Sequence, residues 1–548
     1  MAEMLNNHFG SVFTKEKSNS IIDHYNLPPS KTILYPFDDI YITEEQVESL
    51  INKLSENKSP GPDEIHPLIL KSSPNSFSKA LTIIFNRSLK YGEIPEEWRL
   101  ANVTPIFKKG IQSDPANYRP ISLTSIVCKM LEKIIKDSMY QHLIINNLIS
   151  TSQHGFLQGK SCLTNLIEFF DIIFHWDDDN IPTDIIYLDI SRAFDSVPHK
   201  RMILKLKAYG FSNAIVTWVS NWLMKRKQRV QLNGEKSNWI DVMSGTPQGS
   251  VLATILFLIY IDDLDDALIY FYIIISKFAD DSKLAKKINT PNDAIEFQNA
   301  LDRLISWSQK NYLNFNFSKC KVMHVGSKNM NFEYEMENNW LPSTDSEKDL
   351  GVIISNNLKS SNQCLAAKNK ANKILGIINR GITFKSEEVI RKLYTSYVRP
   401  HLEYCVQFWS PYLNKDIDMI EAVQRRATKL IPSLRKLPYE ARLKKLNLYS
   451  LKRRRLRGDM IEVFKMIHNI DKVNIENLFE LCNDSRLRRH NYHLVIKSHV
   501  NKNNCLNFFT RRVINYWNSL PPNVVNCTSL ITFKNNLDIF MSQNNEDF

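Results

Sequence analysis

The stretch Ile269-Tyr-Phe-Tyr-Ile-Ile-Ile-Ser-Lys-Phe-Ala-Asp-Asp281 is rich in aromatic and β-branched residues and ends in two acids. Such residues favour strands, so the stretch predicts a strand, a tight turn that carries the acids, and a second strand. Another apolar run, Ile185-Ile-Tyr-Leu-Asp189, also ends in an acid and predicts a buried strand. A carboxylate at the end of a buried strand is costly unless it is paired or binds a metal. Two such strands side by side would place oxygen ligands suited to Mg²⁺ around one point.

Shorter patterns predict the elements around these strands. Thr43, followed three residues later by Gln46, fits a capping box and predicts the start of a helix. Alternating residues at 229–233 predict an edge strand, with Asn233-Gly234 as a hairpin turn. We expect further strands at 102–107, 321–325 and 350–354. We expect helices at 64–100 (ending near Gly92), 122–148, 198–225, 250–264 and 293–313, and a largely helical chain after 366.

The composition is that of a globular chain. It has 548 residues, of which 43% are hydrophobic and 23% charged, which excludes disorder of the whole chain. The longest apolar runs, Val251–Ile261 and Leu268–Ile275, are shorter than the roughly 20 residues that span a bilayer. The eight cysteines are scattered without a CxxC pair, and no signal peptide precedes them. We therefore expect reduced thiols and an intracellular protein, in the nucleus or cytoplasm, with no membrane partner.

The net charge of +12 is unevenly distributed. Residues 1–365 hold 38 basic and 42 acidic residues, whereas residues 366–548 hold 32 and 16. A strongly basic third indicates a polyanionic partner such as nucleic acid. The densest run predicts four phosphate-binding residues: Arg453, Arg454, Arg455 and Arg457. The alternative is that these arginines lie on solvated helix faces.

Glycine is scarce but clustered. The chain has 15 glycines, and seven of them lie in short loop-like clusters. Their positions predict backbone that needs unusual torsions or close approach. They are Gly61, Gly110, Gly155, Gly159, Gly245, Gly249 and Gly351.

Several motifs follow one another in a specific order. They are PIFKKG (105–110), NYRPISL (117–123), QHGF (153–156), GKSC (159–162), YLDISRAFD (187–195), SGTPQGS (244–250), FADD (278–281), NFSKCKVM (316–323) and DLGV (349–352). Together they resemble the reverse transcriptase family, and more narrowly the polymerases of non-LTR (LINE-type) retrotransposons of the jockey and CR1 groups.

The resemblance implies a right-hand polymerase of the α+β class. Its fingers and palm, with an antiparallel palm sheet, would occupy 59–355, after a linker and lead-in helix at 1–58. A helical thumb-like region would follow at 356–470 and a basic C-terminal region at 471–548. The N-terminal residues resemble the linker that follows an endonuclease domain in this group, so we expect that domain to be missing from this chain.

The implied activity is RNA-directed DNA polymerisation, which copies retrotransposon RNA by two-metal nucleotidyl transfer. The implied partners are an RNA template, a DNA primer, dNTPs and two Mg²⁺ ions, with Mn²⁺ as a possible substitute. Two alternatives remain at this point. One is a catalytically inactive or domesticated RNA-binding relic, and the other is an RNA-directed RNA polymerase, which Phe194 and the FADD turn argue against.

The resemblance also implies roles for individual residues. Asp189 and Asp280 match the metal-binding acids, with Asp281 as the adjacent acid and Lys319 as a proton donor to pyrophosphate. Matches to nucleotide-binding positions are Lys108 (or Lys109), Arg119, Phe194, Gln248 and Gly249. Matches to template-side positions are Asp63, Gln153 and Lys160, where support of packing is as good an explanation as contact with nucleic acid.

Overall fold

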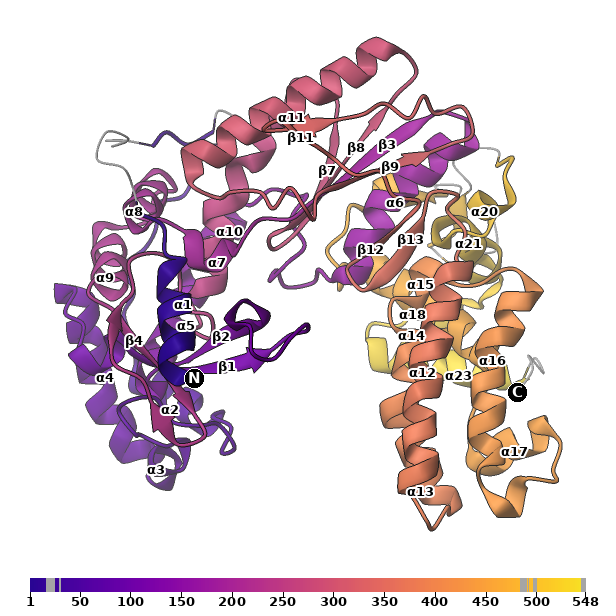
Figure 1. Ribbon diagram of the computed structural model, residues 1–548. Coiled ribbons are helices and arrows are strands. Elements are labelled where there is room, and N and C mark those ends of the chain that lie inside the picture. The colour runs from indigo at the N-terminus through magenta and orange to yellow at the C-terminus, as the bar shows by residue number, and fades with distance from the viewer. Residues whose placement is uncertain (16–24, 29–30, 483–489, 491, 496–499, 544–548) are drawn as a thin grey trace.

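The computed structural model describes residues 1–15, 25–28, 31–482, 490, 492–495 and 500–543. Figure 1 shows two lobes on either side of a sheet that lies across the top of the molecule. The left-hand lobe contains the N-terminal helices and a second sheet. The right-hand lobe is built from the helices that follow residue 360. Throughout the described part of the chain, no helix combines the length and apolarity needed to span a bilayer.

The upper sheet is antiparallel, with strand order β7-β8-β3-β9. Its strands are β7 (Ile274–Phe278), β8 (Asp281–Lys287), β3 (Thr183–Leu188) and β9 (Lys321–Val325). Ile186 and Leu188 of β3 pack into one hydrophobic core, and Ile185 and Tyr187 pack into another. Because both faces of β3 are covered, its sequence is continuously apolar instead of alternating. The strands predicted from the two acid-ending runs are therefore present, and they lie in one antiparallel sheet.

Helices cover both faces of this sheet. The first core contains α10 (Ala253–Ile261), whose residues are almost all buried, and α11 (Pro291–Asn311). The second core contains α6 (Cys162–Asp178) together with helices from the right-hand lobe. A 3-10 segment, η4 (Asp262–Leu268), follows α10 and leads into β7. The predicted helix at 250–264 thus ends at Ile261.

The second sheet belongs to the left-hand lobe and has the order β2-β1-β4-β5, with β6 also paired to β4. Its strands are β1 (Leu100–Phe107), β2 (Tyr118–Leu123), β4 (Lys227–Leu232), β5 (Glu235–Lys236) and β6 (Ile240–Asp241). The Asn233-Gly234 hairpin is confirmed, with φ of 52° and 88°. The prediction of an edge strand at 229–233 is wrong, because β1 pairs with β4 in parallel. Alternation reveals one solvated face, but it does not reveal a partner strand from elsewhere in the chain.

The helices of this lobe surround the second sheet. Thr43 and Gln46 form both hydrogen bonds of the predicted capping box. The predicted helix at 198–225 is two helices, separated at Gly210, whose φ is 76°. The helices are α2 (Glu44–Asn52), α3 (Pro67–Ser72), α4 (Pro74–Tyr91), α5 (Ile126–Ile145), α8 (His199–Ala208) and α9 (Asn213–Leu223).

The N-terminal residues are folded, although the sequence predicts a linker there. Helix α1 (Ala2–Ser11) buries Leu5 and Phe9 against Val103 of β1 and Val230 of β4. Two apolar residues four positions apart lie on one face of a helix, which is why so short a segment can attach to the sheet. The lead-in therefore forms part of the left-hand lobe.

The right-hand lobe is helical, as predicted after residue 366. Its longer helices are α12 (Ser361–Gly381), α16 (Asn414–Lys429), α18 (Leu451–Ile467), α21 (Phe509–Ser519) and α23 (Leu530–Gln543). Shorter ones are α13 (Glu387–Leu393), α14 (Pro400–Glu403), α15 (Val406–Trp409), α17 (Tyr439–Leu446), α19 (Ile475–Leu478), α20 (Asn503–Leu506) and α22 (Pro522–Val525). Two-stranded pairs complete the described chain: β10 (Glu335–Met336) with β11 (Asn339–Trp340), β12 (Ser346–Asp349) with β13 (Val352–Ser355), and β14 (Glu480–Leu481) with β15 (Leu494–Val495).

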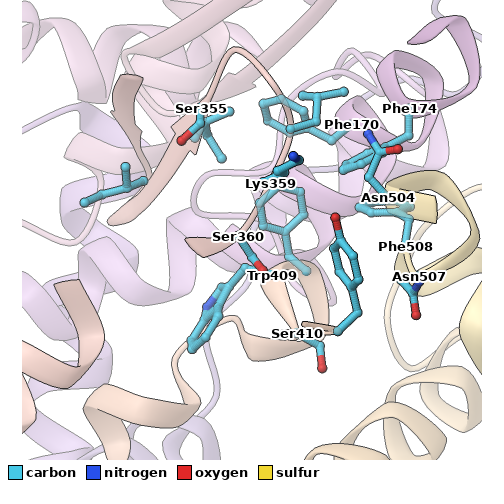
Figure 2. A pocket seen from close by; sticks show the side chains of 15 residues that line it. Phe170, Phe174, Ser355, Lys359, Ser360, Trp409, Ser410, Asn504, Asn507 and Phe508 are labelled. Carbon is cyan, nitrogen blue, oxygen red and sulfur yellow. The ribbon is translucent and has the colours of Figure 1, made fainter. Parts of the chain in front are cut away.

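This lobe is packed against α6 of the palm. The backbone N–H groups of Asn501 and Lys502 donate to the carboxylate of Asp178, at the C-terminal end of α6. Phe174 of α6 stacks on Phe508, with ring centroids 4.3 Å apart. Aromatic side chains from both partners line a small pocket at this junction, as Figure 2 shows. The C-terminal residues therefore help to hold the palm helix.

Candidate active site

The register of the palm sheet brings the predicted acids together. Leu188 of β3 pairs with Ser282 of β8 in the antiparallel ladder, so the next residue on each strand, Asp189 and Asp281, are adjacent. Asp280 lies in the two-residue turn between β7 and β8. Thus three carboxylates from two separate sequence motifs meet at one edge of the sheet.

These carboxylates repel one another. Burial raises the pKa of Asp280, and the charge of Asp189 raises it further. Burial, followed by the charges of Asp280 and Asp189, raises the pKa of Asp281 to about 6. Lys319 Nζ donates to Asp189 Oδ2 at 2.9 Å and offsets part of the negative charge. The site therefore favours an added cation.

The chemistry of the donor set fits a hard divalent cation. Mg²⁺ binds oxygen ligands and commonly takes only one or two carboxylates, with the rest supplied by water and substrate phosphates. Among the residues that the structure describes, no three acidic, imidazole or thiol groups lie close enough to hold a metal by themselves. Asp189 and Asp280, with Asp281 beside them, are thus a partial ligand set that substrate oxygens would complete.

A cavity of about 360 Å³ opens beside the acids. Asp189 and Asp281 form part of its wall, and Lys319 and Lys321 of the palm add positive charge. Lys109, from the loop between β1 and β2, also lines it. The left-hand lobe therefore reaches the acids through this loop.

The β1–β2 hairpin carries the predicted triphosphate-binding cations. Burial lowers the pKa of Lys108, and the neighbouring charges of Arg119 and Lys319 lower it further, while Asp195 and Asp280 oppose the shift. Those neighbours indicate that Lys108 lies near Arg119 and near Asp280. Because Lys109 lines the adjacent cavity, both lysines lie at the site, and the question of which one is used remains open.

Phe194 lies on a short helix, α7 (Ala193–Ser196), directly after β3. Its ring stacks on Phe257 of α10, with centroids 4.3 Å apart, and meets Phe156 edge-on at 6.0 Å. Aromatic contacts on two sides hold the ring in one position. A ring held in one position can exclude bulky groups of a ligand from the space next to the ring.

The loop that contains Gln248 packs on the backbone of β2. The N–H of Ser122, on β2, donates to the carbonyl of Gln248 at 2.7 Å. At Gly249 a Cβ would lie only 2.6 Å from the carbonyl oxygen of Ser122, and φ is 124°. The close approach predicted for this glycine is confirmed, and it joins the Gln248 loop to the β1–β2 hairpin.

Comparisons with known proteins agree with this geometry. Residues 106–378 match the family model described as reverse transcriptase (RNA-dependent DNA polymerase). The chain therefore contains a reverse transcriptase domain. All of the acids, the hairpin cations and the Gln248 loop described above lie inside the matched residues.

Curated relatives of this chain come from transposable elements. One is the probable RNA-directed DNA polymerase from transposon X-element of Drosophila melanogaster, 26% identical over 70% of this chain and 43% of the relative. Another, from transposon BS of the same species, is 26% identical over 76% of this chain and 47% of its own length. The RNA-directed DNA polymerase from mobile element jockey of Drosophila funebris is 24% identical over 78% and 48%. The chain thus spans a little under half the length of these relatives.

Gln153 supports the reverse transcriptase turn from behind. Its side chain is only 2% exposed, and Oε1 accepts from the N–H groups of both Ala279 (2.9 Å) and Gly155 (2.8 Å). Ala279 needs this support because its φ of 57° is unfavourable for a residue with a Cβ. Gln153 is therefore buried away from nucleic acid, and of the two explanations left open by the sequence, packing support is the one that fits.

Asp63 and Lys160, the other two template-side predictions, lie in different surroundings. Lys160 Nζ donates to the carbonyl of Thr151 at 2.5 Å, inside its own loop. Both carboxylate oxygens of Asp63 are buried, and neither has a hydrogen-bond partner among the described residues. The buried carboxylate of Asp63 is not presented to solvent, whereas the half-buried Lys160 makes its contact at the surface.

The arginine run on α18 is neutralised inside the right-hand lobe. Arg454 forms a bidentate pair with Glu403, and Arg457 does so with Asp538, at 2.5 and 2.8 Å. Arg453 and Arg455 are each 6% exposed, and Arg453 lies 4.1 Å from the ring of Tyr449. These contacts use the arginines inside the lobe, and phosphate binding by the run stays a prediction. Charge density along a sequence does not reveal which charges meet acids in the fold.

Sequence reasoning missed two contacts that acidic residues make next to the site. Lys283 of β8 is buried and pairs with Asp349 of the DLGV motif, which ties β12 to the strand that begins at Asp281. Asp195, the last residue of YLDISRAFD, accepts two hydrogen bonds from Gln248. For Asp195, the available signal was its place in the same motif as Asp189, the predicted metal ligand.

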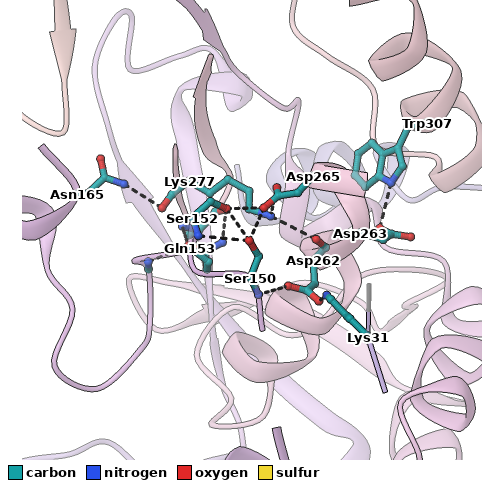
Figure 3. Close-up of polar contacts among 12 residues, drawn as sticks. Lys31, Ser150, Ser152, Gln153, Asn165, Asp262, Asp263, Asp265, Lys277 and Trp307 are labelled. Atoms are coloured by element: carbon teal, nitrogen blue, oxygen red, sulfur yellow. Dashed lines mark hydrogen bonds and ion pairs between the residues drawn. The ribbon is translucent and has the colours of Figure 1, made fainter. Parts of the chain in front are cut away.

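A buried polar network lies behind β7, as Figure 3 shows. Lys277, fully buried on β7, pairs with Asp265 of η4 at 2.6 Å. Asp265 also accepts from Ser152, which lies beside Gln153. Since Lys277 is three residues before Asp280, this network anchors the strand that presents the acid.

Proposed function

We propose that this chain is an RNA-directed DNA polymerase that copies retrotransposon RNA into DNA, using dNTPs and a DNA primer. The observation that carries the proposal is the meeting of Asp189 and Asp280 at one sheet edge, within the part of the chain that matches the reverse transcriptase family. The names of the transposon relatives support the same activity. The assignment of fingers, palm and thumb to the left-hand lobe, upper sheet and right-hand lobe is part of the proposal.

The acidic and the basic residues have different roles at this site. Asp189 and Asp280 would hold two Mg²⁺ ions, which supply charge neutralisation for the attacking and leaving oxygens. Lys108 and Arg119 bind the triphosphate, since a guanidinium and an ammonium complement its negative charge. Lys319 provides a proton for the departing pyrophosphate from its position 2.9 Å from Asp189.

Phe194 selects the sugar. Its ring is wedged between Phe257 and Phe156 and cannot rotate out of the way. A ribose 2′-hydroxyl placed against the ring would collide with it, whereas a deoxyribose would fit. The proposed preference for dNTPs over rNTPs follows from this contact.

The nucleic-acid surface that we propose is α12 in place of α18. Helix α12 carries Lys368, Lys370, Lys373 and Arg380 and no acidic residue. Lys370, Lys373 and Arg380 are exposed. In Figure 1, α12 lies on the side of the right-hand lobe nearest the fingers. An exposed cationic helix on that side of the lobe suits the backbone of a template–primer duplex.

Primer extension by the purified chain tests the proposed activity. The assay uses a DNA primer on an RNA template with Mg²⁺ and either dNTPs or rNTPs. We expect dNTP incorporation that is lost in Asp280→Asn. The matched control is Asp241→Asn, an exposed acid-to-amide change on β6 of the fingers sheet, which should leave incorporation intact.

Each other outcome identifies a different error. Incorporation that survives Asp280→Asn would refute the metal assignment. Incorporation of rNTPs in preference to dNTPs would favour an RNA polymerase. Binding of RNA with no extension under any condition would favour the non-catalytic alternative.

A salt titration tests the proposed surface. We expect the combined change of Lys370, Lys373 and Arg380 to alanine to reduce the slope of log affinity against log salt. Each lost phosphate contact should lower the slope by roughly 0.7 to 0.9. A slope equal to that of the unmodified chain would reject α12 as the binding surface.

A further inference from the structure

The side chain of Gln248 is held by a carboxylate that none of the preceding roles uses. Gln248 Nε2 lies 3.0 Å from Asp195 Oδ1 and 3.1 Å from Asp195 Oδ2. An ionised carboxylate accepts hydrogen bonds but cannot donate them. The amide nitrogen must therefore face Asp195, and the carbonyl oxygen Oε1 must point to the other side.

Asp195 is itself held rigidly. Its backbone carbonyl accepts from Ser244 Oγ at 2.7 Å, and its N–H donates to the carbonyl of Arg192 at 2.9 Å. At Gly245 a Cβ would lie 2.7 Å from Asp195 Cα, so the loop before Gln248 lies directly on the Asp195 backbone. A side chain on such a constrained backbone offers few alternative positions to its partner.

The N-terminal segment braces the same contact. The N–H of Thr14 donates to Ser244 Oγ at 2.7 Å, and Thr14 Oγ1 donates to the carbonyl of Ser196 at 2.7 Å. Thr14 therefore bridges the Gln248 loop and helix α7, one on each side of Asp195. Contacts from three separate segments converge on the Asp195–Gln248 pair.

The pair lies within the proposed nucleotide site. Burial raises the pKa of Asp195 to about 6, while the hydrogen bonds from Gln248 and the charges of Arg192, Lys108 and Arg119 oppose the shift. Lys108 and Arg119 are the cations assigned to the triphosphate, so Asp195 lies near the position that the nucleotide would take. At pH 8 its carboxyl group is ionised and accepts from Gln248.

We propose that Asp195 is a positioning residue that orients the Gln248 amide, so that its carbonyl oxygen faces the incoming nucleotide. Asp195 would thereby set nucleotide affinity without taking part in the chemical step. The inference rests on the proposed polymerase function and extends it to a residue outside the acids and cations already assigned. Losing one hydrogen bond to a charged group corresponds to roughly a tenfold change in affinity.

A double-mutant cycle tests whether Asp195 acts through Gln248. The variants are Asp195→Asn, Gln248→Ala and the two combined, assayed at pH 8 with Asp241→Asn as the exposed-acid control. We expect each single variant to raise the KM for dNTP about tenfold with kcat changed less than about threefold. The combined variant should be no worse than Gln248→Ala alone, because the second change then removes nothing further. Multiplicative effects, or a loss confined to kcat, would overturn the proposal.

A measurement that needs no activity separates this inference from the proposed function. Selective ¹⁵N labelling of glutamine, with Gln248→Ala to assign the signal, reports the side-chain amide of Gln248 directly. We expect Asp195→Asn to shift that signal and speed its proton exchange, and Asp241→Asn to leave it unchanged. An unmoved signal would refute the positioning role even in a chain with full activity. A moved signal in a chain without activity would support the contact and reject the polymerase proposal.

Discussion

Substituting alanine for Gly155 is the most direct test of how the palm holds its acids. A Cβ at position 155 would lie 2.2 Å from the backbone nitrogen of Ala279, and 2.9 Å from both Ala279 Cα and the carbonyl carbon of Phe278. Comfortable contacts between heavy atoms begin at about 3.5 Å. The added methyl group therefore requires a separation of more than about 1 Å between the two segments.

The turn cannot yield without moving the catalytic acid. Ala279 directly precedes Asp280. The backbone N–H of Ala279 donates a hydrogen bond to Gln153, which also accepts one from the N–H of Gly155. A misplacement of about 1 Å at a reacting centre can cost roughly 10²-fold in rate. We therefore expect Gly155→Ala to lower kcat about 100-fold while the KM for dNTP changes little. Overpacking should also cost about 1–3 kcal/mol of stability.

The assay is incorporation of a single dNTP on an RNA template, measured under single-turnover conditions with saturating Mg²⁺. The control is Gly381→Ala, at the end of α12, where a Cβ would meet no heavy atom within 4 Å. Thermal melting of both variants distinguishes a displaced turn from general unfolding. A folded Gly155→Ala protein that incorporates at the unmodified rate would refute the reasoning.

Three further predictions concern stability. Lys277→Met leaves Asp265 without its buried partner and should lower the free energy of unfolding by about 3–5 kcal/mol. Adding Asp265→Asn should recover part of this loss. An unchanged melting temperature for the single variant would contradict the prediction. Burial raises the pKa of Glu462 to about 8. The native state therefore keeps a proton that Glu462 of the unfolded chain releases near the ordinary pKa of a glutamate. Stability should consequently fall as pH rises from about 5 to 8. Glu462→Gln should flatten that dependence in melting experiments at pH 6 and 9, and parallel curves for the two proteins would reject it. Arg457→Ala breaks the bidentate pair with Asp538 and should lower stability by about 1.5–3 kcal/mol. RNA affinity, measured by filter binding, should stay within about twofold. A large loss of affinity would instead support a nucleic-acid role for that arginine.

Local signals in the sequence predicted the elements that carry the site. The acids after Leu188 and Ala279 were recognisable because strand propensity and turn chemistry depend on neighbouring residues. The helix start at Thr43 was recognisable for the same reason, since a capping box spans four residues. The clustered glycines predicted close backbone approach at Gly155 and Gly249, although not which segment approaches them.

Contacts between distant segments were beyond the reach of these signals. The sequence suggested an edge strand at 229–233, and only the parallel pairing with β1 makes it an interior strand. Residues 1–11 are polar enough to suggest a linker, yet Leu5 and Phe9 suffice to attach them once β1 and β4 provide an apolar surface. Both corrections arise because a strand or helix shows its own pattern and not its partner's.

The sequence by itself determined the family, the order of the motifs and the identity of the acids, because each depends on residue type and short spacing. Tertiary structure alone decided which charges are available for function. Arg454 and Arg457 meet acids 51 and 81 residues away, and Asp195 meets an amide 53 residues away. A partner in the fold offsets part of a charge's attraction for a ligand, whereas a charge without a partner keeps all of it. The sequence shows how many charges there are, and the fold decides which of them remain unpaired.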